Sequence, residues 1–130
     1  MPLVRITARD SRSEKTLRAV GDAVHDALVT YFAVPEGDRL QIRERVGAGV
    51  LEADQFFGFE RRDPVVVEVT LRGGRTPEMK RAFYAAVAKG VHERAAVSPR
   101  DVTIVLRENG SPDWSFGDGI AQYAPEEVPA

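Results

Sequence analysis

Residues 65–78 read VVVEVTLRGGRTPE, which joins a β-rich apolar run to a two-glycine loop and the start of a helix. The valines and Leu71 predict a strand, and a run this continuously apolar is typical of burial on both faces. Thr76-Pro77-Glu78 supplies an N-cap residue, a proline at the first helical position and an acid in the first turn. This stretch therefore predicts a strand followed directly by a helix that extends to about Arg94.

The first half of the chain carries the same pattern. A strand is expected over about residues 3–8, and a helix should begin near the capping-box pair Ser11 and Glu14 and end before Pro35. Shifting the chain by 63 positions aligns identical residues in strand, loop, helix and turn: Thr7 with Thr70, Arg9 with Arg72, Arg12 with Arg75, Arg18 with Arg81, Ala19 with Ala82, Ala33-Val34 with Ala96-Val97, and Asp38 with Asp101. One register kept over so many elements indicates an internal duplication.

The duplication predicts an α+β fold in one domain over residues 1–130. Each repeat, about 2–46 and 65–107, would be a β-α-β unit whose parallel strands are joined by a right-handed helical crossover. Two such units give a four-stranded mixed sheet with both helices on one face. The other face then needs cover, which a chain this small would most easily find by associating with copies of itself. Residues 47–62 are expected to form a loop with short extended pieces, and 108–130 to pack on a neighbouring subunit.

Composition limits the class of protein. The 130 residues include 43% hydrophobic side chains, carry a net charge of −2 and contain no cysteine. A weakly acidic chain gives no reason to expect nucleic acid or an anionic membrane as a partner. Without cysteine, disulfides, thiolate catalysis and cysteine-based metal sites are excluded. There is no long apolar run and no signal-peptide pattern, so we expect a cytoplasmic protein that uses no metal or cofactor.

Pro2 is the most distinctive candidate for chemistry. A small second residue allows Met1 to be removed, which leaves a free secondary amine at the N-terminus. An α-amino group has a pKa of roughly 7.7 to 8.0, so part of it is unprotonated at neutral pH and can transfer protons or attack a carbonyl. The alternative is that Pro2 only starts a strand, where a proline costs no ladder hydrogen bond. Because that strand lies inside the predicted sheet, we expect the amine to be partly buried.

Two arginines follow the strand of the second repeat. Arg72 and Arg75 flank Gly73-Gly74 directly before the predicted helix. Guanidinium groups beside a helix N-terminus favour an anionic ligand, most simply a carboxylate. The alternative is a pair of solvated loop arginines, which Arg9 and Arg12 illustrate at the equivalent positions of the first repeat.

Other residues have both a structural and a chemical interpretation. Asp38, in the turn before the second predicted strand, could orient a water or the amine, or could only cap the turn or pair with the arginine that follows. His25 and His92 fall on predicted helices, where we expect them to pack or face solvent. Trp114 and Phe116 form an aromatic cluster in a glycine-rich segment, which could line a pocket or bury against a neighbouring subunit.

Taken together, these motifs resemble the tautomerase superfamily and, within it, the malonate semialdehyde decarboxylase group. The resemblance rests on the duplicated β-α-β pattern, the arginine loop and three segments: Met1-Pro2-Leu3, Pro35-Glu36-Gly37-Asp38-Arg39, and Asp113-Trp114-Ser115-Phe116-Gly117 with the following Gly119, Ala121-Gln122 and Tyr123. It implies a homotrimer with active sites around the N-terminal prolines at the subunit boundaries. The roles that it implies are Pro2 as catalytic amine, Asp38 as the acid beside it, Arg72 and Arg75 as carboxylate clamp, and Trp114 and Phe116 as pocket lining.

The resemblance also implies a reaction: decarboxylation of malonate semialdehyde or a similar small 3-oxo acid, with protonated Pro2 polarising the carbonyl or with a Schiff base at the same amine. A keto–enol tautomerase or hydratase of a 2-oxo acid such as phenylenolpyruvate, with neutral Pro2 as base, is one alternative. A non-catalytic trimeric binding protein is another. This chain departs from many of the decarboxylases, in which a single residue separates the two arginines. Arg75, next to the helix start, is the expected anion holder of the pair.

Overall fold

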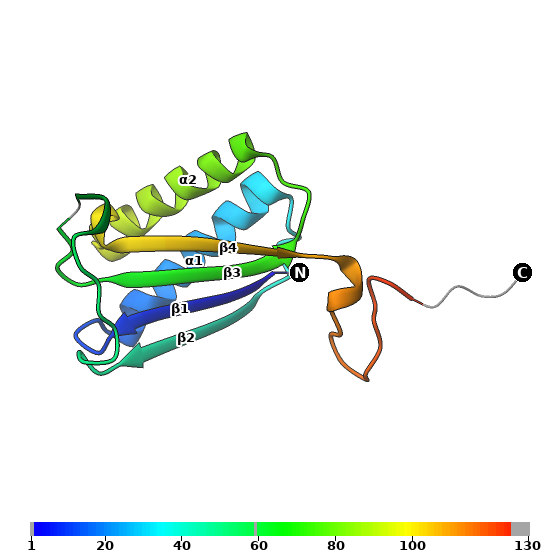
Figure 1. Cartoon of the computed structure of the whole chain (residues 1–130), viewed down its shortest axis with the longest axis horizontal. Helices are drawn as coiled ribbons and strands as arrows, with labels where there is room; N and C mark the ends of the chain where they lie inside the picture. Colours follow the sequence, from blue (N-terminus) through cyan, green and yellow to red (C-terminus); the bar gives the residue numbers. More distant parts are fainter. Residues whose placement is uncertain (1, 59, 126–130) are drawn as a thin grey trace, which may run out of the picture.

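The computed structural model describes residues 2–58 and 60–125, which fold into a mixed sheet with two long helices (Figure 1). The elements in chain order are β1 (Leu3–Arg9), α1 (Glu14–Phe32), β2 (Leu40–Val46), β3 (Val65–Arg72), α2 (Pro77–Ala95) and β4 (Val102–Asn109). Single 3-10 turns lie at Phe56–Gly58, Pro99–Asp101 and Ser111–Asp113. Both helices cover the same face of the sheet, so the predicted fold class is confirmed.

The sheet has the strand order β2-β1-β3-β4. β1 pairs in parallel with β2, and β3 in parallel with β4, whereas β1 and β3 are antiparallel. Each parallel pair is one repeat, and the antiparallel contact joins the two repeats. The helix ends keep the offset found in the sequence, because the N-caps are Ser13 and Thr76 and the left-handed C-cap residues are Ala33 and Ala96. The internal duplication is thus a duplication of structure.

The core lies between the sheet and the helices. The side chains of Phe32 and Phe83, one from each helix, stack with their ring centroids 4.7 Å apart. Alternate residues of β3 are buried against this layer: Val65, Val67, Val69 and Leu71. The residues between them are only half-buried. The prediction that β3 is buried on both faces is therefore wrong for the single chain, because no helix covers the second face.

The start of α1 also differs from the prediction. Ser13 is the N-cap, and its side chain accepts a hydrogen bond from the backbone N–H of Thr16 at 3.1 Å. Ser11 instead donates its hydroxyl to the carboxylate of Asp63. The capping box predicted at Ser11 is therefore wrong, because a partner far along the chain takes up that hydroxyl.

One end of the sheet gathers the segments that matter for function. Figure 1 shows the start of β1 beside the ends of β3 and β4, with the segment after β4 extending beyond the sheet. The long loop between β2 and β3 lies at the opposite end. In that loop the structure contains turns and one 3-10 turn but no strand among the described residues. The expectation of a loop over residues 47–62 is confirmed for the residues that the structure describes there.

Candidate active site

Pro2 is buried and lies directly before β1. The next residue, Leu3, pairs with Leu40 of β2 on one side and with Thr70 of β3 on the other. β1 is therefore an inner strand from its first residue, and the sheet fixes the backbone at its start. The structure places Pro2 where the duplication predicts, at the head of an inner strand.

A small cavity of about 20 Å³ lies beside Pro2 and has room for about one water molecule. Its described lining residues are Pro2, Val34, Leu71, Arg72 and Arg75. Val34 follows α1, whereas Leu71 and Arg72 end β3. Because β1 and β3 are antiparallel, the end of β3 meets the start of β1. The fold thus brings two guanidinium groups to the N-terminal proline.

Arg75 is held by two backbone carbonyls. Its Nη1 donates to the carbonyl of Arg72 at 2.8 Å, and its Nη2 donates to the carbonyl of Phe32 at 3.0 Å. Phe32 ends α1, and the last carbonyls of a helix have no partner within it and carry partial negative charge. Between the arginines, Gly74 has a φ of 117°, a conformation that favours glycine. The two-glycine spacing therefore still allows both arginines to line the cavity.

Arg72 has more N–H groups that are not used in hydrogen bonds to described residues than Arg75 has. Its Nη1 lies 3.5 Å from the hydroxyl oxygen of Ser111, and its guanidinium carbon lies 3.7 Å from the centre of the Tyr123 ring, in a cation–π contact. Both arginines also line a wider hollow of about 460 Å³, together with Gly73, Asn109, Gly110 and Ser111. An anion in this hollow would find free N–H groups on Arg72 beside the fixed guanidinium of Arg75.

Asp38 lies in the turn that leads into β2, and its side chain is half-buried. Because β2 pairs with β1 from its first residue, this turn reaches the same end of the sheet as Pro2. Within the described part of the chain, the Asp38 carboxylate has no hydrogen bond or ion pair. The neighbouring Arg39 pairs with Asp22 of α1 at 2.6 Å, so the alternative of an Asp38–Arg39 pair is not what the structure contains.

His25 ties this turn to α1. Its side chain is 3% exposed, and Nε2 lies 2.8 Å from the carbonyl oxygen of Glu36. The ring N–H therefore donates to the backbone two residues before Asp38. His25 packs in the helix as expected, but the sequence did not reveal that it anchors the turn. His92 on α2 is exposed.

The groups equivalent to Arg75 and Asp38 are paired with one another at the opposite end of the sheet. Arg12 donates from Nη2 to the carboxylate of Asp101 at 3.2 Å, and Asp101, the counterpart of Asp38, is 6% exposed. Arg9 donates to a loop carbonyl at 2.9 Å. The prediction that Arg9 and Arg12 are solvated loop arginines is therefore wrong, because both are half-buried and hydrogen-bonded within the fold. At the end of the sheet near Pro2, by contrast, no ion pair among the described residues joins Arg72 or Arg75 to Asp38.

Trp114 and Phe116 lie on the segment after β4 and are not among the described residues that line the small cavity. Their rings stack with centroids 5.4 Å apart, and Trp114 Nε1 donates to Asn109 Oδ1 at 2.7 Å. Phe116 meets the ring of Tyr123 edge-on at 4.9 Å, and Tyr123 in turn contacts Arg72. The aromatic stack thus reaches the candidate site through Tyr123.

Sequence reasoning missed Tyr123 and Asn109 as members of the site. Tyr123 covers Arg72, and Asn109 fixes the indole of Trp114. A usable signal existed for Asn109, because the parallel register of the second repeat places it opposite Arg72. Tyr123 gave a weaker signal, since its contact depends on how a glycine-rich segment folds back.

Among residues 2–58 and 60–125, no cluster of His, Asp or Glu is arranged to hold a metal ion. In the same residues, neither α1 nor α2 is sufficiently long and apolar to cross a membrane.

Comparison with known proteins identifies the family. Residues 38–117 match the family model described as tautomerase enzyme. Probable tautomerase YusQ of Bacillus subtilis (strain 168) is 36% identical over 124 residues, which cover 94% of this chain and 98% of the relative. The solved structure of FG41 malonate semialdehyde decarboxylase inhibited by 3-bromopropiolate is 40% identical, with a TM-score of 0.88 and coverage of 94% of both chains. A malonate semialdehyde decarboxylase solved in wild-type, mutant and inactivated forms is 32% identical, with a TM-score of 0.84 and coverage of 93% and 95%. This chain belongs to the family of tautomerase enzymes.

Proposed function

We propose that this protein decarboxylates malonate semialdehyde or a similar small 3-oxo carboxylic acid without a cofactor, with Pro2 as the reacting amine. The observation that carries the proposal is that Pro2, Arg72 and Arg75 line one cavity. The likeness to a decarboxylase of 40% identity supports it. A small cavity next to a wider hollow with the same two arginines suits a substrate with only a few carbon atoms.

The residues would divide the work between the two ends of the substrate. Arg75, already fixed by backbone carbonyls, and Arg72, with free donors, would hold the carboxylate. Pro2 would contact the carbonyl oxygen. Asp38 would lie beside the amine, where a carboxylate favours the protonated form of Pro2.

In the first route, the protonated amine donates a hydrogen bond to the aldehyde oxygen. The bond between the carboxylate and the α-carbon breaks, its electron pair forms the carbon–carbon double bond of an enol, and carbon dioxide leaves. The enol oxygen takes the proton from Pro2 as negative charge develops on it. Protonation of the α-carbon from solvent, with return of the oxygen's proton to Pro2, then gives acetaldehyde. The sum is one substrate anion and one proton converted to acetaldehyde and carbon dioxide.

In the second route, Pro2 attacks the aldehyde and forms an iminium ion with loss of water. Loss of carbon dioxide then gives an enamine, which is protonated on carbon and hydrolysed back to the free amine and acetaldehyde. The net reaction is the same in both routes.

A keto–enol tautomerase is the second candidate, because a relative at 36% identity is named a probable tautomerase. Neutral Pro2 would then take a proton from one atom of a 2-oxo acid and return it to another. A proline that is mostly cationic at working pH cannot serve efficiently as this base. The protonation state of Pro2 therefore separates the two candidates.

We also propose that the protein works as a homotrimer, as the resemblance implies, with residues 108–130 packed on a neighbouring subunit. Residues 126–130 lie outside the described part of the chain. The uncovered sheet face supports the proposal, because Leu40 and Ile42 of β2 are 43% and 38% exposed there. Trp114 and Phe116 would then line the substrate pocket at a subunit boundary.

The deciding experiment combines intact mass with turnover by wild type and Pro2→Ala. We expect a mass without Met1, release of acetaldehyde from malonate semialdehyde, and a loss of roughly hundredfold or more in Pro2→Ala. Faster turnover of phenylenolpyruvate would favour the tautomerase. Fully retained Met1, or equal rates in both proteins, would remove Pro2 from the chemistry. If no 3-oxo or enol acid is turned over, the result would favour the alternative of a non-catalytic binding protein.

A further inference from the structure

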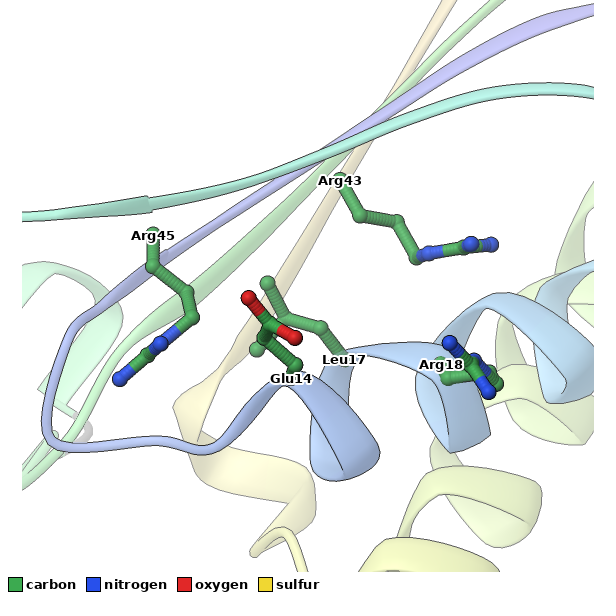
Figure 2. A pocket seen from close by; sticks show the side chains of 5 residues that line it. All are labelled: Glu14, Leu17, Arg18, Arg43 and Arg45. Carbon is green, nitrogen blue, oxygen red and sulfur yellow. The ribbon is translucent and has the colours of Figure 1, made fainter.

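A second cavity, of about 440 Å³, lies between β2 and the first turns of α1. The candidate active site is at the other end of this helix, where Phe32 binds Arg75. Figure 2 shows the side chains that line the cavity: Glu14, Leu17, Arg18, Arg43 and Arg45. Arginines from a helix and from an adjacent strand therefore share one hollow.

The cavity has an excess of positive charge. It contains three guanidinium groups and one carboxylate, and none of these four groups forms an ion pair with another described residue. In Figure 2 the guanidinium groups of Arg18 and Arg43 lie on one side of Glu14, and that of Arg45 lies on the other. Uncompensated guanidinium groups in one hollow favour an anionic ligand.

The three arginines differ in how firmly they are held. Arg45 donates to the backbone carbonyls of Arg12 and Asp10 at 2.7 and 2.9 Å, so it is fixed against the loop before α1. Arg43 donates from one nitrogen to a neighbouring glutamine at 3.0 Å, and Arg18 has no hydrogen bond within the described residues. Arg18 and Arg43 therefore keep the donors that a ligand could use.

Gly21 allows β2 to approach α1 at this point. Gln41 Nε2 donates to the Gly21 carbonyl at 2.9 Å. A Cβ atom at Gly21 would collide with Gln41 Oε1 and lie 3.4 Å from the Cδ atom of Arg43. Because Gly21 has no side chain, Gln41 and Arg43 of β2 can pack directly against α1.

The second repeat shows that this edge of the fold does not require arginines. The positions equivalent to Arg43 and Arg45 are Leu106, which packs against the core, and Glu108, which pairs with Lys80. Charged residues often protect an edge strand from pairing, but β4 is also an edge strand of the single chain. Protection of an edge strand therefore does not explain why β2 has arginines at the positions that face its helix, whereas β4 has Leu106 and Glu108 there.

We propose that this cavity binds a compact dianion, most simply a phosphate group, between Arg18 and Arg43, with Arg45 adding positive charge. A phosphate group has about two negative charges near neutral pH and several strong acceptor oxygens, which match two guanidinium groups. The proposal does not depend on the decarboxylase, because the site shares no residue with the Pro2 cavity.

The test is a calorimetric titration of the full chain with inorganic phosphate at constant ionic strength, with sodium chloride as the matched salt. Arg18→Gln and Arg43→Gln are compared with Arg81→Gln, the position equivalent to Arg18 in the second repeat. Arg81 lies on the exposed surface of α2 and pairs only weakly, at 3.3 Å, with Glu78. Thermal unfolding of each variant checks that it is folded.

We expect phosphate to bind, and each cavity variant to lower its affinity about tenfold, the equivalent of one charge-assisted hydrogen bond. Arg81→Gln should bind like the wild type. Equal affinity in Arg18→Gln, Arg43→Gln and wild type would place any bound phosphate elsewhere, for example on Arg72 and Arg75, and overturn the proposal. Absence of heat beyond that of chloride would overturn it as well.

Discussion

Arg75 and Arg12 occupy equivalent positions in the two repeats, but different groups hold them. Arg12 pairs with the buried carboxylate of Asp101 and with that of Asp63. Arg75 donates to two backbone carbonyls and lies over the Phe32 ring, and it has no carboxylate partner among the described residues. A backbone carbonyl orients a guanidinium without cancelling its charge. At the scale of residues, the arginine at one end of the sheet is therefore neutralised by carboxylates, whereas the arginine at the end near Pro2 keeps a positive charge that a ligand could bind.

This difference predicts opposite effects of the same substitution at equivalent positions. Asp101→Asn should lower the free energy of unfolding by about 1–3 kcal/mol, because it removes one of the two carboxylates, Asp101 and Asp63, that pair with Arg12. Asp38→Asn should leave stability nearly unchanged, since its carboxylate has no partner among the described residues. It should instead lower kcat for the proposed decarboxylation roughly hundredfold.

Urea unfolding and steady-state kinetics on both variants measure the two effects. Asp101→Asn, assayed where it is fully folded, serves as the activity control because it lies at the far end of the sheet. Loss of kcat in Asp101→Asn, or normal kcat in Asp38→Asn, would contradict the assignment of the two ends.

Much of the site could be predicted at this scale, because its signals are local in sequence. Pro2 is at the chain start, and Arg72 and Arg75 are fixed by a strand, two glycines and a helix start. The partners of these residues could not be predicted. Tyr123 contacts Arg72 because the segment after β4 folds back on the site, and residue spacing along the sequence does not predict that contact.

At the scale of elements, α1 supports both sides of the candidate site. Its last residue gives a carbonyl to Arg75, and His25 in its interior donates to Glu36. Both sides of the candidate site, the arginine loop and the Asp38 turn, are therefore fixed to the same rigid helix. A residue such as His25 acts by positioning, since no contact with the cavity is made by its own ring.

Removing this anchor is expected to move the Asp38 turn. His25→Ala leaves the Glu36 carbonyl without its buried donor, which should cost about 1–3 kcal/mol of stability and lower kcat roughly tenfold. His25→Gln keeps an N–H donor and should recover most of kcat. His92→Ala on the exposed face of α2 is the control for loss of a helical histidine.

Measuring kcat of His25→Ala under conditions in which the variant is fully folded distinguishes an effect on the position of the Asp38 turn from an effect on stability alone. If His25→Ala lost stability but kept the wild-type kcat, the hydrogen bond would hold the fold and not the site.

The helices also show what local patterns can and cannot specify. The prediction of α2 from Thr76-Pro77 is confirmed, because the cap, the proline and the strand before it all act locally. The start of α1 was placed at Ser11, since Ser11 and Glu14 have capping-box spacing. Asp63, which lies far along the chain, takes the Ser11 hydroxyl and leaves Ser13 as the cap.

At the scale of the whole molecule, one sheet face is packed and the other is open. The open face is mixed in character, with apolar Leu40 and Ile42 close to the ion pair between Arg5 and Glu44. Periodicity predicted the packed face correctly, because amphipathic helices must bury their apolar side. It could not say what covers the open face, for which we propose other copies of the chain.

Native mass spectrometry should detect three copies of the 14.3 kDa chain in the assembly. Ile42→Asp, which puts a charge on the open face, should shift this mass toward the monomer because a buried unpaired carboxylate is unfavourable. Val50→Asp is the matched control, since Val50 is 73% exposed in the loop at the other end of the sheet. A monomeric wild type, or a trimer in Ile42→Asp, would rule out this face as the interface.

Pro2 at the head of β1 has its structural counterpart in Val65 at the head of β3, yet Val65 is joined to Pro64 by a peptide bond. Duplication copied the arginines and the aspartate, but the reacting amine that we propose for Pro2 has no counterpart at Val65, whose nitrogen is part of a peptide bond. The proposed mechanism therefore allows one reacting amine per polypeptide, so a reagent that labels this amine should attach once to each chain, although the sheet has two similar ends.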